Sequence, residues 1–258
     1  MPKLPAELYY AEIDASTASL AVLIEYADPV LPIPACPDWT LSQLAAHVGR
    51  VQRRSAEMVA TRATGPIDPE LVPDIELPAD LAARGRWLTA GAGRLISALR
   101  EAGEETVWAF GTAGPAGVWA RRMANEAMVH AADAAAAAGE EVSFVPELAA
   151  DAIDEWLTLL SGPIFGRPDR RAAVLPEGAS LHVHATDPEL GSTGEWLVTH
   201  EPGGVEVVSG HAKATVAVSG AAADLLLVLL GRRSPASGGI QVFGDAGLLD
   251  AWLAGISF

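Results

Sequence analysis

The spacing of apolar residues changes along the chain, and this change limits the folds that the chain can adopt. As far as about residue 160, apolar residues recur every three to four positions, which is the period of an amphipathic helix. Beyond segment 162–171, short valine-rich runs alternate between apolar and polar residues, as strands do. The chain has 258 residues and is longer than most single domains. The sequence therefore predicts an α+β protein, with a helical domain at 1–161 and a smaller α+β domain at 172–258.

Four long helices are expected in the first domain. Three of them are expected at 8–27, 41–61 and 79–101. The fourth has Pro115 in its first turn and stops at Gly139. Four such helices joined by loops favour an antiparallel bundle. A shorter helix at 146–160 is expected to follow, and the glycines, prolines and charges of 162–171 indicate a connector between domains.

The start of the second helix carries the clearest local signal. Thr40 can cap the helix, and Gln43 can return a hydrogen bond to the backbone of Thr40, which together make a capping box. Segment 29–37 just before it is rich in proline, which blocks helix continuation and restricts the preceding residues. We expect this segment to be a stiff connector.

The second domain is predicted to combine strands with two helices. The strand-like runs lie at 179–186, 195–200, 205–208, 213–218 and 240–243. The helical runs are 221–230 and the segment from Ala246 onward. Strands followed by helices in one segment are typical of an α+β module.

Charge and composition argue against several classes of partner. The chain has 17 basic and 33 acidic residues, a net charge of −16, which repels a phosphate backbone and an anionic membrane surface. We expect neither nucleic acid nor membrane as a partner. Cys36 is the only cysteine, so no intramolecular disulfide can form. The richest apolar run, 225–230, is too short to cross a bilayer. We therefore expect a soluble cytoplasmic protein.

One face of the fourth helix carries polar side chains that need an explanation. Its members follow one another at steps of four, three, four and three residues, in the order Trp119, Met123, Glu126, His130 and Asp133. Glu126 and His130 are one turn apart, so a carboxylate oxygen and an imidazole nitrogen can share one cation. The pair taken alone is also consistent with a solvated surface pair.

His47 on the second helix strengthens the metal hypothesis. It follows Leu44 by three residues and precedes Val51 by four, which places it on the apolar side of its helix. A single inward histidine is commonly a satisfied core residue. Two helices that direct histidine, glutamate and histidine into one interior instead meet the ligand count of a divalent metal such as zinc. The candidate metal ligands are His47, Glu126 and His130.

These residues lie in segments that resemble the mycothiol-dependent maleylpyruvate isomerase family. The segments are CPDWTLSQLAAHVGR at 36–50, RRMANEAMVHAADAAAAAG at 121–139 and GAAADLLLVLLGRRSPASGGIQVFGDAGLLDAWL at 220–253. The resemblance implies a DinB-like four-helix bundle that binds zinc through His47, Glu126 and His130, followed by a small sterol-carrier-like α+β domain. Asn125 and Ala131-Ala132 depart from residues common in the family, so the resemblance does not fix the substrate.

The resemblance also implies a cofactor and a reaction. Mycothiol, a low-molecular-weight thiol, would bind zinc as a thiolate and attack a small-molecule substrate. The outcome would be a cis–trans isomerisation of the maleylpyruvate type or transfer of the thiol. The family's C-terminal domain supplies an arginine to the reaction, and Arg232 is the first candidate here, with Arg233 as its neighbour. A surface arginine at a helix end explains Arg232 equally well.

Other interpretations of the same residues stay open at this point. A noncatalytic protein that binds metal or a small ligand would keep the same bundle. A zinc hydrolase would need a general base, for which Asp133 is the acidic candidate; Asp133 could also orient a ligand histidine, or be a plain polar residue. His182 and His184 share one face of an expected strand and could chelate metal, but an exposed pair on a half-buried sheet is the simpler explanation. Cys36 has no basic or histidine neighbour in sequence, so we expect it to be dispensable.

Overall fold

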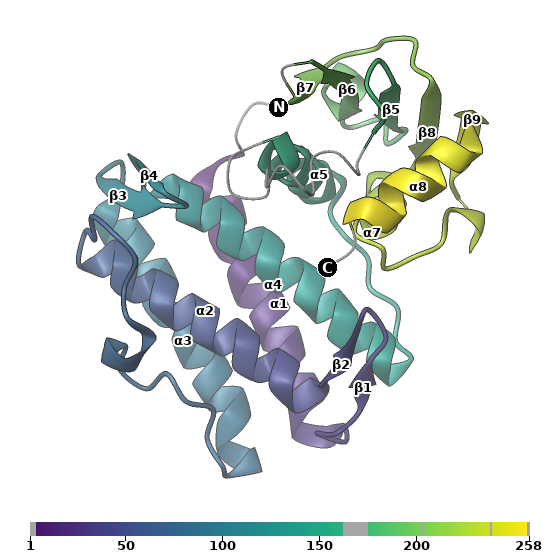
Figure 1. Cartoon of the computed structure of the whole chain (residues 1–258). Coiled ribbons are helices and arrows are strands. Elements are labelled where there is room, and N and C mark those ends of the chain that lie inside the picture. Colours follow the sequence, from purple (N-terminus) through teal and green to yellow (C-terminus); the bar gives the residue numbers. More distant parts are fainter. Residues whose placement is uncertain (1–3, 162–174, 203, 238, 257–258) are drawn as a thin grey trace. The chain divides into compact units, whose positions relative to one another are not determined.

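The structure is a computed structural model that describes residues 4–161, 175–202, 204–237 and 239–256 (Figure 1). It divides into two compact units, Leu4–Val142 and Ser143–Phe258. The expected connector at 162–171 lies outside the described residues. None of the described helices has both the length and the apolar character needed to cross a bilayer.

The first unit is a four-helix bundle, as the sequence predicted (Figure 1). Its helices are α1 (Ala6–Tyr26), α2 (Leu41–Ala60), α3 (Leu81–Ala102) and α4 (Gly117–Ala138). Helices α1 and α2 each pack on both α3 and α4. A short 3-10 turn, η1 (Pro69–Leu71), lies between α2 and α3.

Helices α2 and α3 approach each other closely at Gly49. A Cβ atom built on Gly49 would lie 2.0 Å from Cζ3 of Trp87, so only a glycine leaves room for this ring. The indole of Trp87 also lies beneath a buried guanidinium, with the Cζ atom of Arg53 3.9 Å from the ring centroid. The contact between these two helices therefore depends on the missing side chain at Gly49.

The helix ends agree with the sequence at two of three places. The amide of Gln43 donates to the Thr40 hydroxyl at 3.3 Å and the amide of Thr40 donates to the Gln43 side chain at 2.8 Å, which confirms the capping box of α2. Helix α4 ends at Gly139, whose φ of 75° is left-handed. The prediction for Pro115 was wrong, because Pro115 ends a strand and α4 begins two residues later, at Gly117.

Two short hairpins in the first unit were not predicted. Strands β1 (Pro32–Ile33) and β2 (Cys36–Thr40) pair in the segment that was expected to be a connector. Strands β3 (Thr106–Ala109) and β4 (Thr112–Pro115) pair just before α4. The two turn residues between β3 and β4, Phe110 and Gly111, both have positive φ, as in tight hairpin turns.

The second unit contains a five-stranded sheet in the order β7-β6-β5-β8-β9. Strands β5 and β8 are parallel, and the other neighbours are antiparallel. The strands are β5 (Ser180–Ala185), β6 (Glu195–Glu201), β7 (Gly204–Ser209), β8 (Val216–Gly220) and β9 (Gln241–Gly244). The helices are α5 (Pro146–Ser161), α7 (Ala222–Leu229) and α8 (Ala246–Ile256), with 3-10 turns η2 (Gly191–Gly194) and η3 (Pro235–Ser237).

Helices cover one face of this sheet, and the other face carries a mixture of polar and apolar side chains, among them His182, Leu197 and Phe243. Trp196 on β6 and Trp252 on α8 are fully buried, and the indole of Trp196 donates a 3.0 Å hydrogen bond to Asp154 on α5. Helix α5 also packs on α7 and β7. The compact units therefore group α5 with the sheet, whereas the sequence-based ranges counted it with the bundle at 1–161.

Candidate metal centre

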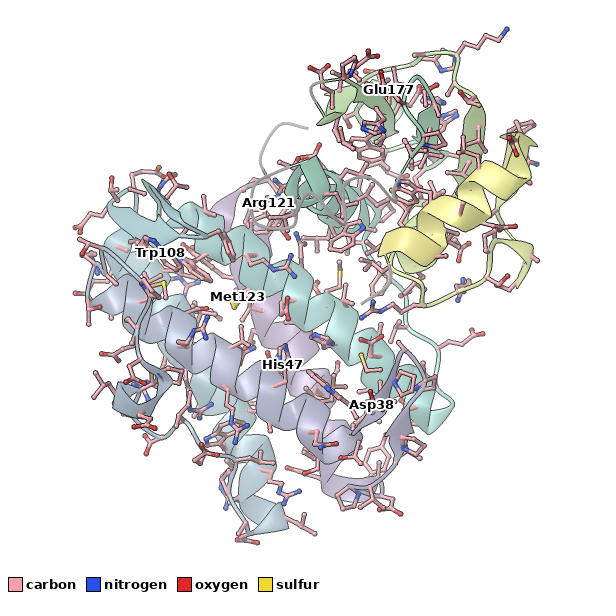
Figure 2. All side chains as sticks on the ribbon, viewed as in Figure 1. Asp38, His47, Trp108, Arg121, Met123 and Glu177 are labelled. Carbon is pink, nitrogen blue, oxygen red and sulfur yellow. The ribbon has the colours of Figure 1, made fainter. Side chains whose placement is uncertain are left out.

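Helices α2 and α4 bring together the three candidate metal ligands. Figure 2 labels one of them, His47 on α2. Nε2 of His47 on α2 lies 3.0 Å from Oε1 of Glu126 on α4. Nε2 of His130, one turn further along α4, lies 3.2 Å from the same oxygen. The ligand atoms of the three residues all lie within 4.8 Å of one another. The set that the sequence pattern selected therefore meets at one point inside the bundle.

The second oxygen of Glu126 is occupied by an arginine. The guanidinium of Arg122, one turn earlier on α4, pairs with Oε2 of Glu126 and leaves Oε1 toward the histidines. Burial acts to raise the pKa of Glu126, but Arg122, His130 and His47 outweigh it and keep the pKa well below its usual value. Glu126 is therefore ionised at neutral pH.

His130 is oriented by a second carboxylate. Oδ2 of Asp133 lies 3.0 Å from Nδ1 of His130, and the Asp133 side chain is 0% exposed. Burial acts to lower the pKa of His130, but Asp133 and Glu126 together raise it to about 9. A carboxylate on the far nitrogen directs Nε2 toward the ligand position. Of the roles considered for Asp133, its contact supports that of an orienting residue.

Trp39 forms a wall beside both histidines. Its ring centroid lies 4.9 Å from that of His47 and 6.4 Å from that of His130, with the latter rings inclined by 27°. The two histidine rings meet nearly edge to face, at 5.0 Å. Sequence reasoning gave neither Trp39 nor Arg122 a role at this site. The spacing of Arg122 four residues before Glu126 was a usable signal, whereas nothing in sequence placed Trp39 there.

The donor atoms fit a divalent metal of the zinc type. Two imidazole nitrogens and one carboxylate oxygen are a ligand set that zinc accepts, and three protein ligands leave one position for another molecule. Tetrahedral zinc places its ligand atoms about 3.3 Å apart. The separations of 3.0 and 3.2 Å between Glu126 and the two histidines are close to that value.

The other candidate residues make contacts of their own. Arg232 follows the end of α7, and its guanidinium donates to the carbonyl of Leu230 at 2.7 Å. The guanidinium of Arg233 pairs with Asp224 of α7. Cys36, at the start of β2, is half-buried and packs against the bundle core.

The expectation of an exposed histidine pair on the sheet was wrong. His182 is buried, with 5% of its side chain exposed. Its neighbour on the strand, His184, is only half-buried. The difference arises because the segment after β7 returns over His182, with the ring of His211 5.1 Å from that of His182.

Fold and site together define a class: a two-domain protein whose four-helix bundle presents a histidine–glutamate–histidine set, followed by an α+β domain. The mycothiol maleylpyruvate isomerase N-terminal domain matches residues 10–135, and the C-terminal domain of the same family matches residues 147–251. The chain therefore belongs to the mycothiol maleylpyruvate isomerase family, as its sequence segments indicated.

Solved structures support the same fold. A crystal structure of the mycothiol-dependent maleylpyruvate isomerase superposes with a TM-score of 0.58 at 18% identity, covering 94% of this chain and 95% of the other. A histidine-to-alanine mutant of that isomerase gives a TM-score of 0.59 at the same identity and coverage. No curated protein sequence matches the chain. At this identity the likeness establishes the fold, including the α+β class.

Proposed function

We propose that this protein is a zinc- and mycothiol-dependent enzyme that isomerises a small unsaturated acid or transfers the thiol to it. The observation that carries the proposal is the convergence of His47, Glu126 and His130 in a chain of this family. The solved relatives are described as mycothiol-dependent maleylpyruvate isomerase, which supports an isomerisation of that type. The thiol transfer is the second form of the same chemistry.

Zinc bound by these residues would lower the pKa of a coordinated thiol, so that the reactive thiolate exists at neutral pH. The residues of the chain prepare this position. Arg122 keeps Glu126 ionised and turns Oε1 toward the histidines. Asp133 accepts a hydrogen bond from the Nδ1–H group of His130, so the lone pair of Nε2 becomes available to the metal once the proton on Nε2 is displaced.

The placement of Asp133 argues against the zinc hydrolase. A general base must reach a proton of water or substrate. Asp133 is fully buried and engaged with His130, so its carboxylate supports the histidine. The chain's own thiol is also not needed in this proposal, since the nucleophile is supplied by mycothiol.

Arg232 is proposed as the cation that stabilises negative charge developing on the substrate. An arginine in the C-terminal domain is what resemblance to the family implies for this role. The guanidinium of Arg233 pairs with Asp224. The proposal keeps Arg232, which is the first candidate that the resemblance indicates. A preorganised cation of this kind acts on the transition state and not on the metal.

The proposal is tested by turnover with defined components. Zinc-loaded protein is mixed with mycothiol and maleylpyruvate, and the cis and trans acids and any thiol adduct are quantified by NMR. We expect product only when zinc and mycothiol are both present, and none with the His47→Ala variant. If the protein binds zinc and mycothiol but yields neither the trans acid nor a thiol adduct, the proposed enzymatic function is wrong. That result would support a noncatalytic binding protein.

A further inference from the structure

A second cluster of metal-ligating side chains lies on the sheet of the C-terminal unit. It contains His182 on β5, Glu195 on β6 and His211 just after β7. Strand register explains how they meet. Glu195 is paired with His184, the neighbour of His182 on the same face of β5. The amide of Gly210 donates to the carbonyl of Glu195 at 2.9 Å, which brings the following histidine back over the sheet.

The ligand atoms of this cluster converge on one point. Oε2 of Glu195 lies 3.0 Å from Nε2 of His182 and 2.7 Å from Nδ1 of His211. The three ligand atoms lie within 4.8 Å of one another. These separations are similar to those of the set in the bundle. His184 lies beside the cluster, with its ring centroid 6.0 Å from that of His182, but outside the converging set.

His182 supplies an independent sign that a ligand is expected here. Its Nε2 atom is buried and makes no hydrogen bond within the described residues, although Oε2 of Glu195 is only 3.0 Å away. Such a short separation without a hydrogen bond is expected if Nε2 of His182 and Oε2 of Glu195 both point at a common centre rather than at each other. The nitrogen is therefore in contact with Glu195 but not aligned for a hydrogen bond, and a cation held between the two atoms would satisfy both.

Two of the three side chains in the cluster are largely withdrawn from water. The side chain of His182 is 5% exposed and that of Glu195 is 14% exposed. A carboxylate this buried needs a compensating charge, which a divalent cation supplies.

We propose that His182, Glu195 and His211 form a second divalent-metal site, separate from the one in the bundle. Two imidazoles and one carboxylate select a borderline cation such as Zn²⁺ over Mg²⁺ or Ca²⁺, which prefer oxygen ligands. The His211 side chain is 77% exposed, so the site opens to solvent and keeps a free coordination position. A bound ion would link His211, in the segment after β7, to His182 on β5 and Glu195 on β6.

Zinc titration of the full chain tests this site. Chelator-stripped wild-type protein is titrated with Zn²⁺ by calorimetry, beside the full-length His211→Ala and Glu195→Gln variants. Because His211 is exposed, its replacement leaves the fold intact. We expect each variant to bind one equivalent fewer than wild type. The control Glu206→Gln makes the same charge change at an exposed residue of β7 and should bind as wild type does.

The titration separates this site from the one in the bundle. If the bundle binds no zinc, wild type would take up one equivalent and His211→Ala none, which still supports the second site. NMR of the histidine ring nitrogens gives a second readout, since Zn²⁺ should shift those of His182 and His211 but not those of His200 on β6. Equal zinc uptake by wild type, His211→Ala and Glu195→Gln would overturn the proposal and leave an ion pair in its place.

Discussion

Replacing Asp133 by asparagine tests how the ligand set in the bundle is oriented. The change keeps the shape of the side chain but removes its charge and one acceptor oxygen. Asp133 is fully buried and 3.0 Å from Nδ1 of His130, so water cannot replace the lost contact. An amide nitrogen in that place favours the tautomer with its proton on Nε2, the nitrogen that must bind the metal. We expect zinc affinity to fall about 10- to 100-fold, the range for losing such a partner.

That loss corresponds to about 1.4–2.7 kcal/mol of binding free energy. It is measured by competition for Zn²⁺ against a chromophoric chelator. Asp14→Asn is a matched control, because it makes the same charge change at an exposed residue of α1 that is not among the candidate ligands. Circular dichroism checks that both variants fold. A folded Asp133→Asn variant with wild-type zinc affinity would refute the orienting role.

Three further substitutions test other parts of the account. Gly49→Ala should lower the free energy of unfolding, measured by urea denaturation, by about 1–3 kcal/mol, because the new methyl group overlaps the indole of Trp87. Gly93→Ala, which has open space around it, should instead stabilise α3 by up to about 1 kcal/mol. Cys36→Ser should retain turnover, and its loss with intact fold and zinc would point to the protein's own thiol. Arg232→Ala should lower kcat by about two to three orders of magnitude with unchanged zinc content, whereas Arg233→Ala should not.

Helical periodicity was enough to predict the bundle and to bring the three candidate ligands to one interior. His47 is three residues from Leu44, and Glu126 and His130 are one turn apart, so local spacing alone fixed the face on which each lies. The contact of Trp39 with both histidines depends on the β1–β2 hairpin, which was expected to be a connector. The hairpin was not predicted because its first strand contains Pro32. Proline has no amide hydrogen to donate to a neighbouring strand, so it usually argues against a strand.

The cluster on the sheet could not be found from sequence for a different reason. Periodicity placed His182 and His184 on one strand face, but Glu195 and His211 reach that face through strand pairing. Register between strands depends on the whole sheet, and a shift of one residue would move every side chain to the opposite face. The burial of His182 follows from that pairing, so the sequence-based expectation of an exposed pair missed it.

The zinc content of bundle variants tests the central claim most directly. The second site is first removed with His211→Ala, so that any remaining zinc belongs to the bundle. Protein is stripped with a chelator, reloaded with Zn²⁺, passed through a desalting column and analysed by mass spectrometry for metal. The account predicts one zinc per chain in this background and almost none after His47→Ala or His130→Ala is added. One zinc per chain retained in both of those double variants would contradict it.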